Sequence, residues 1–234
     1  MISQRYVANT KLMIIFGIII VAAVAGVTWP IFINLHLNIA PINASQWHIG
    51  KGSQYNPSMT YMVDYNGTKF QTDVVFQPKN GSMQTMLVSI KPDNGTGTIT
   101  QTIPIGDVYF FTNVTPKAKP YFDILDNTVF AMNWYATSDK YLAKGASWGD
   151  VYIGQLHKHM RVRDCTKTTL PFGTLDTYVL SYMELNGKDN TVWIADNLPL
   201  PVKSQYYYPD QNLEYSYELV SLKASMTPLV ACQG

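Results

Sequence analysis

The pentapeptide GASWG, at residues 145–149, is the part of the sequence whose spacing comes nearest to a catalytic motif. Gly-x-Ser-x-Gly presents a serine nucleophile between a strand and a helix, and the chain then supplies an acid followed by a histidine. The last histidines, His157 and His159, lie only ten and twelve residues beyond Ser147, in a segment that alternates like a strand. A turn accounts for the two glycines better. A serine hydrolase is therefore a remote alternative, and we expect no catalytic residues.

The same two histidines share one face of the expected strand, at a spacing that can chelate a metal ion. Gln155, Arg161 and Arg163 alternate onto that face as well. A closed metal site needs three or four ligands, and no carboxylate or cysteine is spaced to complete one. We interpret this face as solvated and slightly basic, and we expect no metal. Because glycine-rich phosphate loops and CxxC motifs are also missing from the sequence, we expect no cofactor.

A third group of residues is aromatic, and alternation along the expected strands can put its members on one side of a sheet. The group consists of Tyr178, Tyr182, Trp193, Tyr206, Tyr208, Tyr215 and Tyr217. A concave aromatic face can bind an acyl chain, a quinone or a segment of a partner protein. It can equally be the core on which a helix packs, because a curved sheet must bury one face. The second interpretation is favoured, and the first stays open.

The cysteines and the glycosylation triplets suit an exported domain. Cys165 and Cys232 are the only cysteines, and an even count in an oxidising compartment predicts one disulfide, with two unpaired thiols as the alternative. Candidate N-glycosylation acceptors are Asn43, Asn66, Asn80, Asn94 and Asn113. A chain rich in Asn, Ser and Thr also produces such triplets by chance, so their occupancy stays open.

Alternating runs separated by Asn-Gly pairs predict the strands that position these residues. Both central residues of a tight hairpin turn need a positive φ, which Asn and Gly tolerate. We expect strands over 59–65, 68–76, 83–91, 97–103, 106–112, 150–157, 158–167, 174–184, 190–197, 201–208 and 213–223. One helix is expected over Tyr121–Tyr135, where Phe122, Leu125, Val129 and Met132 form a single apolar stripe.

Residues 12–29 form a run of eighteen without a charge. About 20 apolar residues cross the hydrocarbon core of a bilayer, so we predict a transmembrane helix here. Arg5 and Lys11 precede the run, and positive charge on the short side predicts a cytoplasmic N-terminus with the remaining chain outside. The alternative is a signal peptide cleaved after Ala25, where small residues have the spacing of a cleavage site.

These patterns divide the chain into five parts. They are a cytoplasmic N-terminus (1–11), a transmembrane helix (12–34), a stalk (35–57), a β-rich extracytoplasmic domain (58–223) and a C-terminal tail (224–234).

The net charge of +1 excludes nucleic-acid binding driven by phosphate neutralisation. At 47% hydrophobic and 13% aromatic residues, the chain is too apolar to be disordered.

Four stretches between residues 142 and 222 resemble lipoprotein-carrier-like half-barrel proteins and their relatives of unknown function. They are LAKGASWGD, MRVRDCTKTTLPFGTLDTYVLSYM, TVWIADNLPLPVKSQYYY and EYSYELVSL. The resemblance implies an open, strongly curved antiparallel sheet wrapped over a helix, with an apolar concave face. Members of that family carry acyl chains or have no assigned role. The expected fold is thus mainly β, a half-barrel-like curved antiparallel sheet packed on a short helix behind the transmembrane segment.

We expect a single-pass cell-membrane protein whose domain lies outside, is not an enzyme, and binds an apolar ligand such as an acyl chain or an envelope partner. The alternative is a structural or accessory subunit of a membrane or cell-surface complex. Under either hypothesis we expect the protein to be held in the membrane by one anchor. We expect its other partner to be a lipid or an envelope protein, and we expect no nucleic acid.

The predicted topology can be tested by labelling intact cells with a membrane-impermeant amine reagent. Lys11 should be shielded, whereas Lys51 and Lys203 should react, because positive charge keeps the N-terminus inside. Labelling of Lys11 on sealed cells would invert the topology. N-terminal sequencing that begins at Gly26 would show instead that the segment is cleaved.

Overall fold

The computed structural model describes one compact unit of the chain, Ala40–Gly234. Within it the described residues are 44–80, 83–95, 97–105, 111, 114–153, 156–183, 189–207, 212–224 and 232. The other unit, Met1–Ile39, contains the whole of the predicted membrane segment and lies outside the described residues. None of the helices in the described ranges is long and apolar enough to span a bilayer.

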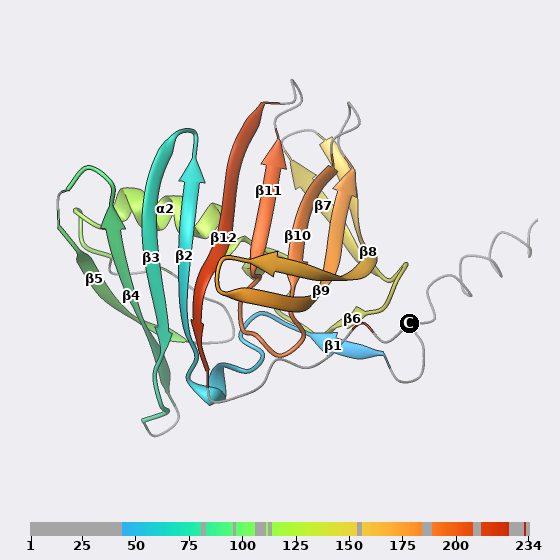
Figure 1. The fold of residues 1–234 in the computed structure, drawn as a ribbon, viewed down its shortest axis with the longest axis horizontal. Coiled ribbons are helices and arrows are strands. Elements are labelled where there is room, and N and C mark those ends of the chain that lie inside the picture. The colour runs from blue at the N-terminus through green and yellow to red at the C-terminus, as the bar shows by residue number, and fades with distance from the viewer. Residues whose placement is uncertain are drawn as a thin grey trace, which may run out of the picture. The chain divides into compact units, whose positions relative to one another are not determined.

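The described chain is mainly β, as the sequence predicts. Its elements are β1 Ser45–Trp47, the 3₁₀ helix η1 Ser53–Tyr55, β2 Ser58–Tyr65, β3 Thr68–Phe76, β4 Gln84–Pro92, β5 Ile99–Ile105, α2 Lys119–Asn127, the 3₁₀ helix η2 Ala131–Trp134, β6 Lys140–Leu142, β7 Ser147–Ile153, β8 Leu156–Leu170, β9 Gly173–Met183, β10 Asp189–Ile194, β11 Lys203–Tyr207 and β12 Leu213–Lys223. Ten strands form one antiparallel sheet in the order β5-β4-β3-β2-β12-β11-β10-β9-β8-β7, and β1 pairs separately with β6. Because β5 and β7 are its edges, the sheet is open and does not close into a barrel (Figure 1).

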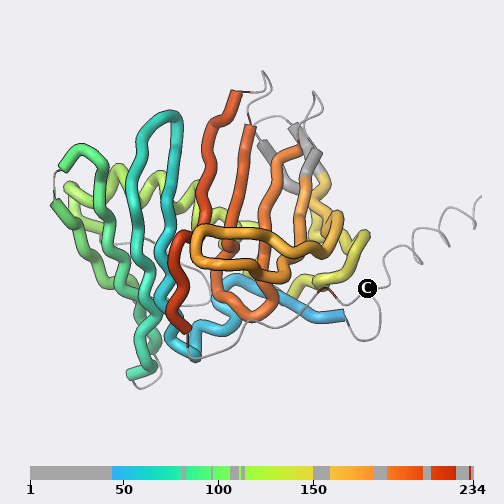
Figure 2. The backbone as a smooth tube through the Cα atoms, viewed as in Figure 1, coloured from blue at the N-terminus to red at the C-terminus, as the bar shows by residue number. Residues whose placement is uncertain are grey.

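Two meanders make up the sheet, and one long-range pairing joins them. Strands β2 to β5 are neighbours in chain order, and so are β7 to β12. The junction is the antiparallel pairing of β2 with β12, in which Val63 lies opposite Tyr217 and Asp64 opposite Ser216. Figure 2 shows these two strands side by side in the middle of the sheet. The junction therefore aligns the two halves of the chain in a single register.

Alternation along the strands sorts the side chains onto two faces of the sheet. On one face, which we call the core face, a row of directly opposite residues is buried from β8 to β4: Val162, Leu180, Val192, Ser204, Tyr217, Val63, Phe70 and Pro92. Helix α2 packs on this face, since the rings of Tyr121 and Phe70 meet edge to face with centroids 5.3 Å apart. In Figure 1 the helix lies behind β3, β2 and β12.

The predicted helix is present but shorter than Tyr121–Tyr135. All four residues of its apolar stripe are buried, as the periodicity predicts. The α-helix ends at Asn127, where the side chains of Asn127 and Thr128 donate hydrogen bonds to the carbonyls of Asp123 and Ile124. Such local side-chain bonds compete with the continuing helix. A short 3₁₀ helix then carries Met132 into the core.

Most strands lie close to their predicted places. The strand over 213–223 has the predicted bounds, and the turn at Asn66-Gly67 has the expected positive φ at both residues, 49° and 79°. β7 begins at Ser147 rather than at 150, and β11 is shorter than 201–208. The strand predicted over 106–112 lies outside the described residues except for Phe111, which belongs to no strand.

The stalk predicted over 35–57 is wrong in its described part. Trp47 is fully buried and stacks on Trp148, with ring centroids 5.9 Å apart. Lys51 forms an ion pair with Asp196, whose side chain is only 6% exposed. The prolines and glycines that suggested a linker therefore mark turns of a segment that packs into the domain.

The hairpin of β8 and β9 folds across the face opposite the core face, which we call the outer face. By alternation Leu175 and Thr177 belong to the outer face, yet both are buried, as are Thr168 and Leu170 on β8. β8 also contacts β12, although three strands lie between them in the sheet. Figure 1 shows the tip of the hairpin crossing in front of β11 and β12. The hairpin thus covers one part of the outer face and leaves the rest open.

Cys165 and Cys232 form the disulfide that the sequence predicts. Cys165 lies on β8 opposite Tyr178 of β9. The sulfur of Cys232 lies 3.8 Å from the carbonyl oxygen of Thr177. The bond therefore holds residue 232 against the β8–β9 hairpin.

We expect Cys232→Ser to lower the melting temperature by several degrees under oxidising conditions. The bridge closes a loop of 67 residues, which the chain-entropy model values at roughly 4 kcal/mol. Calorimetry of the full chain, with and without reductant, measures the effect. Under strong reductant the wild type and the variant should melt together. Two alkylatable thiols in the unreduced wild type would contradict the bridge.

Candidate functional site

A row of polar side chains crosses seven strands on the outer face of the sheet. Its members lie directly opposite one another from β8 to β3: Arg161, Ser181, Thr191, Gln205, Ser216, Asp64 and Lys69. None of them is buried, whereas every member of the parallel row on the core face is. We call this set the polar row. It exists because each strand alternates and because the β2–β12 register keeps both meanders in phase.

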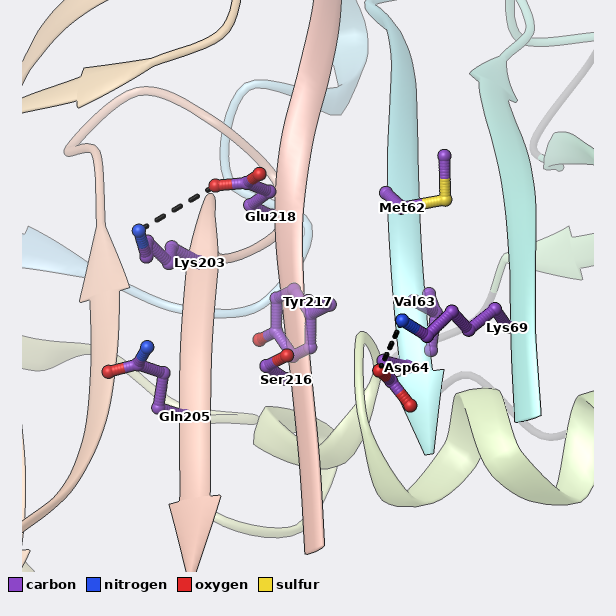
Figure 3. A pocket seen from close by; sticks show the side chains of 9 residues that line it. All are labelled: Met62, Val63, Asp64, Lys69, Lys203, Gln205, Ser216, Tyr217 and Glu218. Atoms are coloured by element: carbon purple, nitrogen blue, oxygen red, sulfur yellow. Dashed lines mark ion pairs between the residues drawn. The ribbon is translucent and has the colours of Figure 1, made fainter. Parts of the chain in front are cut away.

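A hollow of about 310 Å³ lies at the β3 end of the polar row. Figure 3 shows Gln205, Ser216, Asp64 and Lys69 following one another across the strands at this place. Lys69 Nζ lies 3.3 Å from Asp64 Oδ2, so the charges at this end are paired.

Beside the polar row runs a second line of outer-face residues. Lys203 Nζ lies 3.6 Å from Glu218 Oε2 and 5.8 Å from the centroid of the Trp193 ring. Met62 follows Glu218 across the β2–β12 junction and is 40% exposed. This line carries one cation, one anion and two apolar side chains, so it adds no net charge to the hollow in Figure 3.

A second hollow, of about 560 Å³, lies at the other end of the polar row, near the β7 edge. It is lined by Lys144, Gly145, His159, Arg161, Val162, Arg163, Ser181 and Asp189. Asp164, just outside it, accepts a hydrogen bond from the backbone N–H of Cys165, 3.0 Å away, and pairs with Lys144. These two interactions hold the pKa of Asp164 below its usual range. The lining of this hollow nevertheless carries more basic than acidic groups, because Lys144, Arg161 and Arg163 outnumber Asp189.

Ser147 and His159 lie within hydrogen-bond distance of each other at this edge. Ser147 Oγ is 2.6 Å from His159 Nε2, and it also accepts a bond from the N–H of Gly149 at 3.3 Å. A nucleophile elbow requires a helix after the serine, but here Ser147 begins β7. The pair is thus a serine–histidine contact on a sheet edge, without the strand–turn–helix context of the motif.

The register separates the predicted aromatic group. Tyr178, Tyr215 and Tyr217 lie on the core face and are at most 8% exposed, which is the core interpretation that the sequence favoured. Tyr206 is partly buried and stacks on Tyr215, with centroids 5.2 Å apart. Trp193 lies opposite Val179 and Lys203, so the prediction of one shared aromatic face is wrong for it. The side chains of Tyr182 and Tyr208 lie outside the described residues.

Burial sets the ionisation of the core tyrosines. It raises the pKa of Tyr217 well above its usual range, with neighbouring Tyr215 adding to the rise and a hydrogen bond to Ser204 opposing it. Burial also raises the pKa of Tyr178, helped by the negative charges of Asp196 and Asp176. Both phenols stay neutral at any physiological pH, as members of a packed core should.

The predicted glycosylation acceptors that the structure describes are Asn66, Asn80 and Asn94, and all three are exposed. Asn66 lies in the β2–β3 turn and Asn94 in the connection between β4 and β5. Asn43 and Asn113 lie outside the described residues. Glycan attachment stays a prediction.

Among the side chains described, no group of three His, Cys, Asp or Glu residues could hold a metal ion. The side chain of His157 is not among those described.

No protein-family model and no curated protein matches this chain. Among solved structures, a crystal structure of MucB matches with a TM-score of 0.41 and 9% identity, over 77% of this chain and 57% of that chain. The MucA/MucB complex of Pseudomonas aeruginosa matches with 0.36 and 10%, over 76% of this chain and 55% of that one. An exported protein of Bacteroides fragilis with a YmcC-like fold matches with 0.36 and 12%, over 77% and 99%.

The chain thus spans little more than half the length of these MucB chains. At such TM-scores the likeness bears on neither the function nor the site. What stands of the resemblance to lipoprotein-carrier-like proteins is the architecture of the described residues, a large open antiparallel sheet with one short α-helix.

Proposed function

We propose that this chain is an extracytoplasmic, non-enzymatic binding protein that holds a polypeptide segment of an envelope partner on the outer face of its sheet. The observation that carries the proposal is the polar row, in which no member on any of the seven strands is buried, whereas the core face is packed. The disulfide agrees with an oxidising compartment outside the cytoplasm. An acyl-chain ligand is less well supported, because the aromatic residues proposed for it are largely in the core.

The dimensions of the polar row suit an extended chain. Strands are spaced about 4.8 Å apart, so seven strands give a row roughly 29 Å long, which about nine residues of extended polypeptide would span. The row offers hydroxyl and amide groups from Ser181, Thr191, Gln205 and Ser216, which can both donate and accept hydrogen bonds. The β8–β9 hairpin crosses the same face in front of β11 and β12 and limits where a bound segment can lie (Figure 1).

Site-specific photo-cross-linking in the native host tests this proposal. A benzoylphenylalanine placed at Gln205 or Ser216 should give an adduct of defined mass, because these positions lie in the middle of the polar row. The matched control is the same residue at Gln54, an exposed glutamine of η1. Equal cross-linking at Gln54, or none at either position of the row, would contradict the proposal.

The contact between Ser147 and His159 favours one second candidate, an ester hydrolase. At 2.6 Å the imidazole could accept the proton of the serine hydroxyl while the oxygen attacks an ester carbonyl. The absence of the elbow context makes this candidate the weaker one.

We expect Ser147→Ala to leave the hydrolysis of a short-chain p-nitrophenyl ester at the wild-type rate, because β7 does not present the serine as an elbow does. Ser181→Ala, which changes a serine of the hollow that His159 also lines, is the control. A loss of about a hundredfold or more in Ser147→Ala alone would establish the hydrolase instead.

A further inference from the structure

The hollow at the β7 edge holds more positive charge than its carboxylates neutralise. Arg163 is paired with Asp189 across the hollow, and Lys144 Nζ lies 3.3 Å from Asp164 Oδ1. Among the described side chains no carboxylate pairs with Arg161, which is exposed. Lys144 and Asp164 are themselves 75% and 59% exposed, so their pair is weak and can exchange. Among the described side chains of the hollow, the guanidinium of Arg161 therefore has no carboxylate partner. The ammonium group of Lys144 can leave its weak pair and contact a bound anion.

The chain uses arginine almost nowhere else. It has 17 Lys and Arg residues, of which only Arg5, Arg161 and Arg163 are arginine. Both arginines of the described chain line this one hollow. Lysine would serve solubility equally well, whereas the planar guanidinium with its fork of N–H donors matches the oxygens of a phosphate. This distribution indicates that the hollow needs the shape of arginine as well as its charge.

Two further polar side chains line the hollow with Arg161. Ser181 lies directly opposite Arg161 on the neighbouring strand, and its hydroxyl can donate to the same anion. The imidazole of His159 is held at the hollow by its contact with Ser147. Gly145 forms part of the lining with a φ of 86°, a conformation that favours glycine, so no side chain projects from this position. At about 560 Å³ the hollow has the size of a small-molecule site.

We propose that this hollow binds a phosphate group, carried either by a soluble phosphate ester or by a lipid headgroup, with Arg161 as its main ligand. Arg163, Lys144 and Ser181 complete the donor set. The site goes beyond the partner interaction assigned to the polar row and stands without it, since it needs none of the residues on β10, β11 or β12 that occupy the middle of that row.

Binding titrations on the full chain in a neutral detergent test the site. The two probes are inorganic pyrophosphate and short-chain phosphatidylglycerol, followed by isothermal calorimetry. Arg161→Gln should weaken binding by about tenfold or more, because a charge-assisted bidentate contact is lost. Lys167→Gln is the matched control, since it removes one positive charge from an exposed position on the same strand, outside the hollow, and should leave the affinity unchanged.

Each outcome decides the question. Saturable binding of either probe that Arg161→Gln weakens supports the site, and the probe that binds identifies the source of the phosphate. No saturable binding to the wild type, or equal weakening by Lys167→Gln, would overturn it. If Arg161→Gln melts below the wild type, Lys144→Gln replaces it as the test variant. Cross-linking at Gln205 is measured separately, so either proposal can fail alone.

Discussion

The pairing of β2 with β12 is the constraint on which the rest of the structure depends. It joins strands about 150 residues apart in the chain, and it is the only link between the two meanders within the described sheet. A slip of one residue here would turn every side chain of one meander to the opposite face relative to the other. Tyr217 would then leave the buried row and Ser216 would enter it. One register thus creates both a continuous core and a continuous polar face.

The sequence predicted what is local and missed what depends on strand order. Alternation and the Asn-Gly turn placed β2 and β3, and the apolar stripe of α2 identified its buried side. The polar row could not be predicted, because Ser216 and Asp64 become neighbours only through the β2–β12 junction. Trp193 was misplaced for the same reason, since its face is fixed relative to Tyr178 only by the β9–β10 register.

The error over the stalk has a different origin. Proline and glycine mark turns and linkers alike, so composition around Trp47 could not distinguish the two. The distinction comes from long-range partners: Trp148 stacks on Trp47 and Asp196 holds Lys51, and both lie about 100 to 145 residues further along the chain. Trp47, within the supposed linker, was the one local signal of burial, because such a large apolar surface is costly to leave in water.

The disulfide also divides the molecule mechanically. The covalent ring closed by Cys165 and Cys232 encloses β9 to β12 and leaves β2 to β5 outside. If the chain were pulled from its N-terminal side, the distance between residues 165 and 232 could not grow, because the disulfide joins them. The strands ahead of Cys165 could be peeled away one after another, whereas those within the ring could lose their pairing but contribute almost nothing to extension. The strands within the ring, β9 to β12, therefore limit the extension of the chain, whereas the N-terminal meander, β7 and the part of β8 before Cys165 can be pulled out to full length.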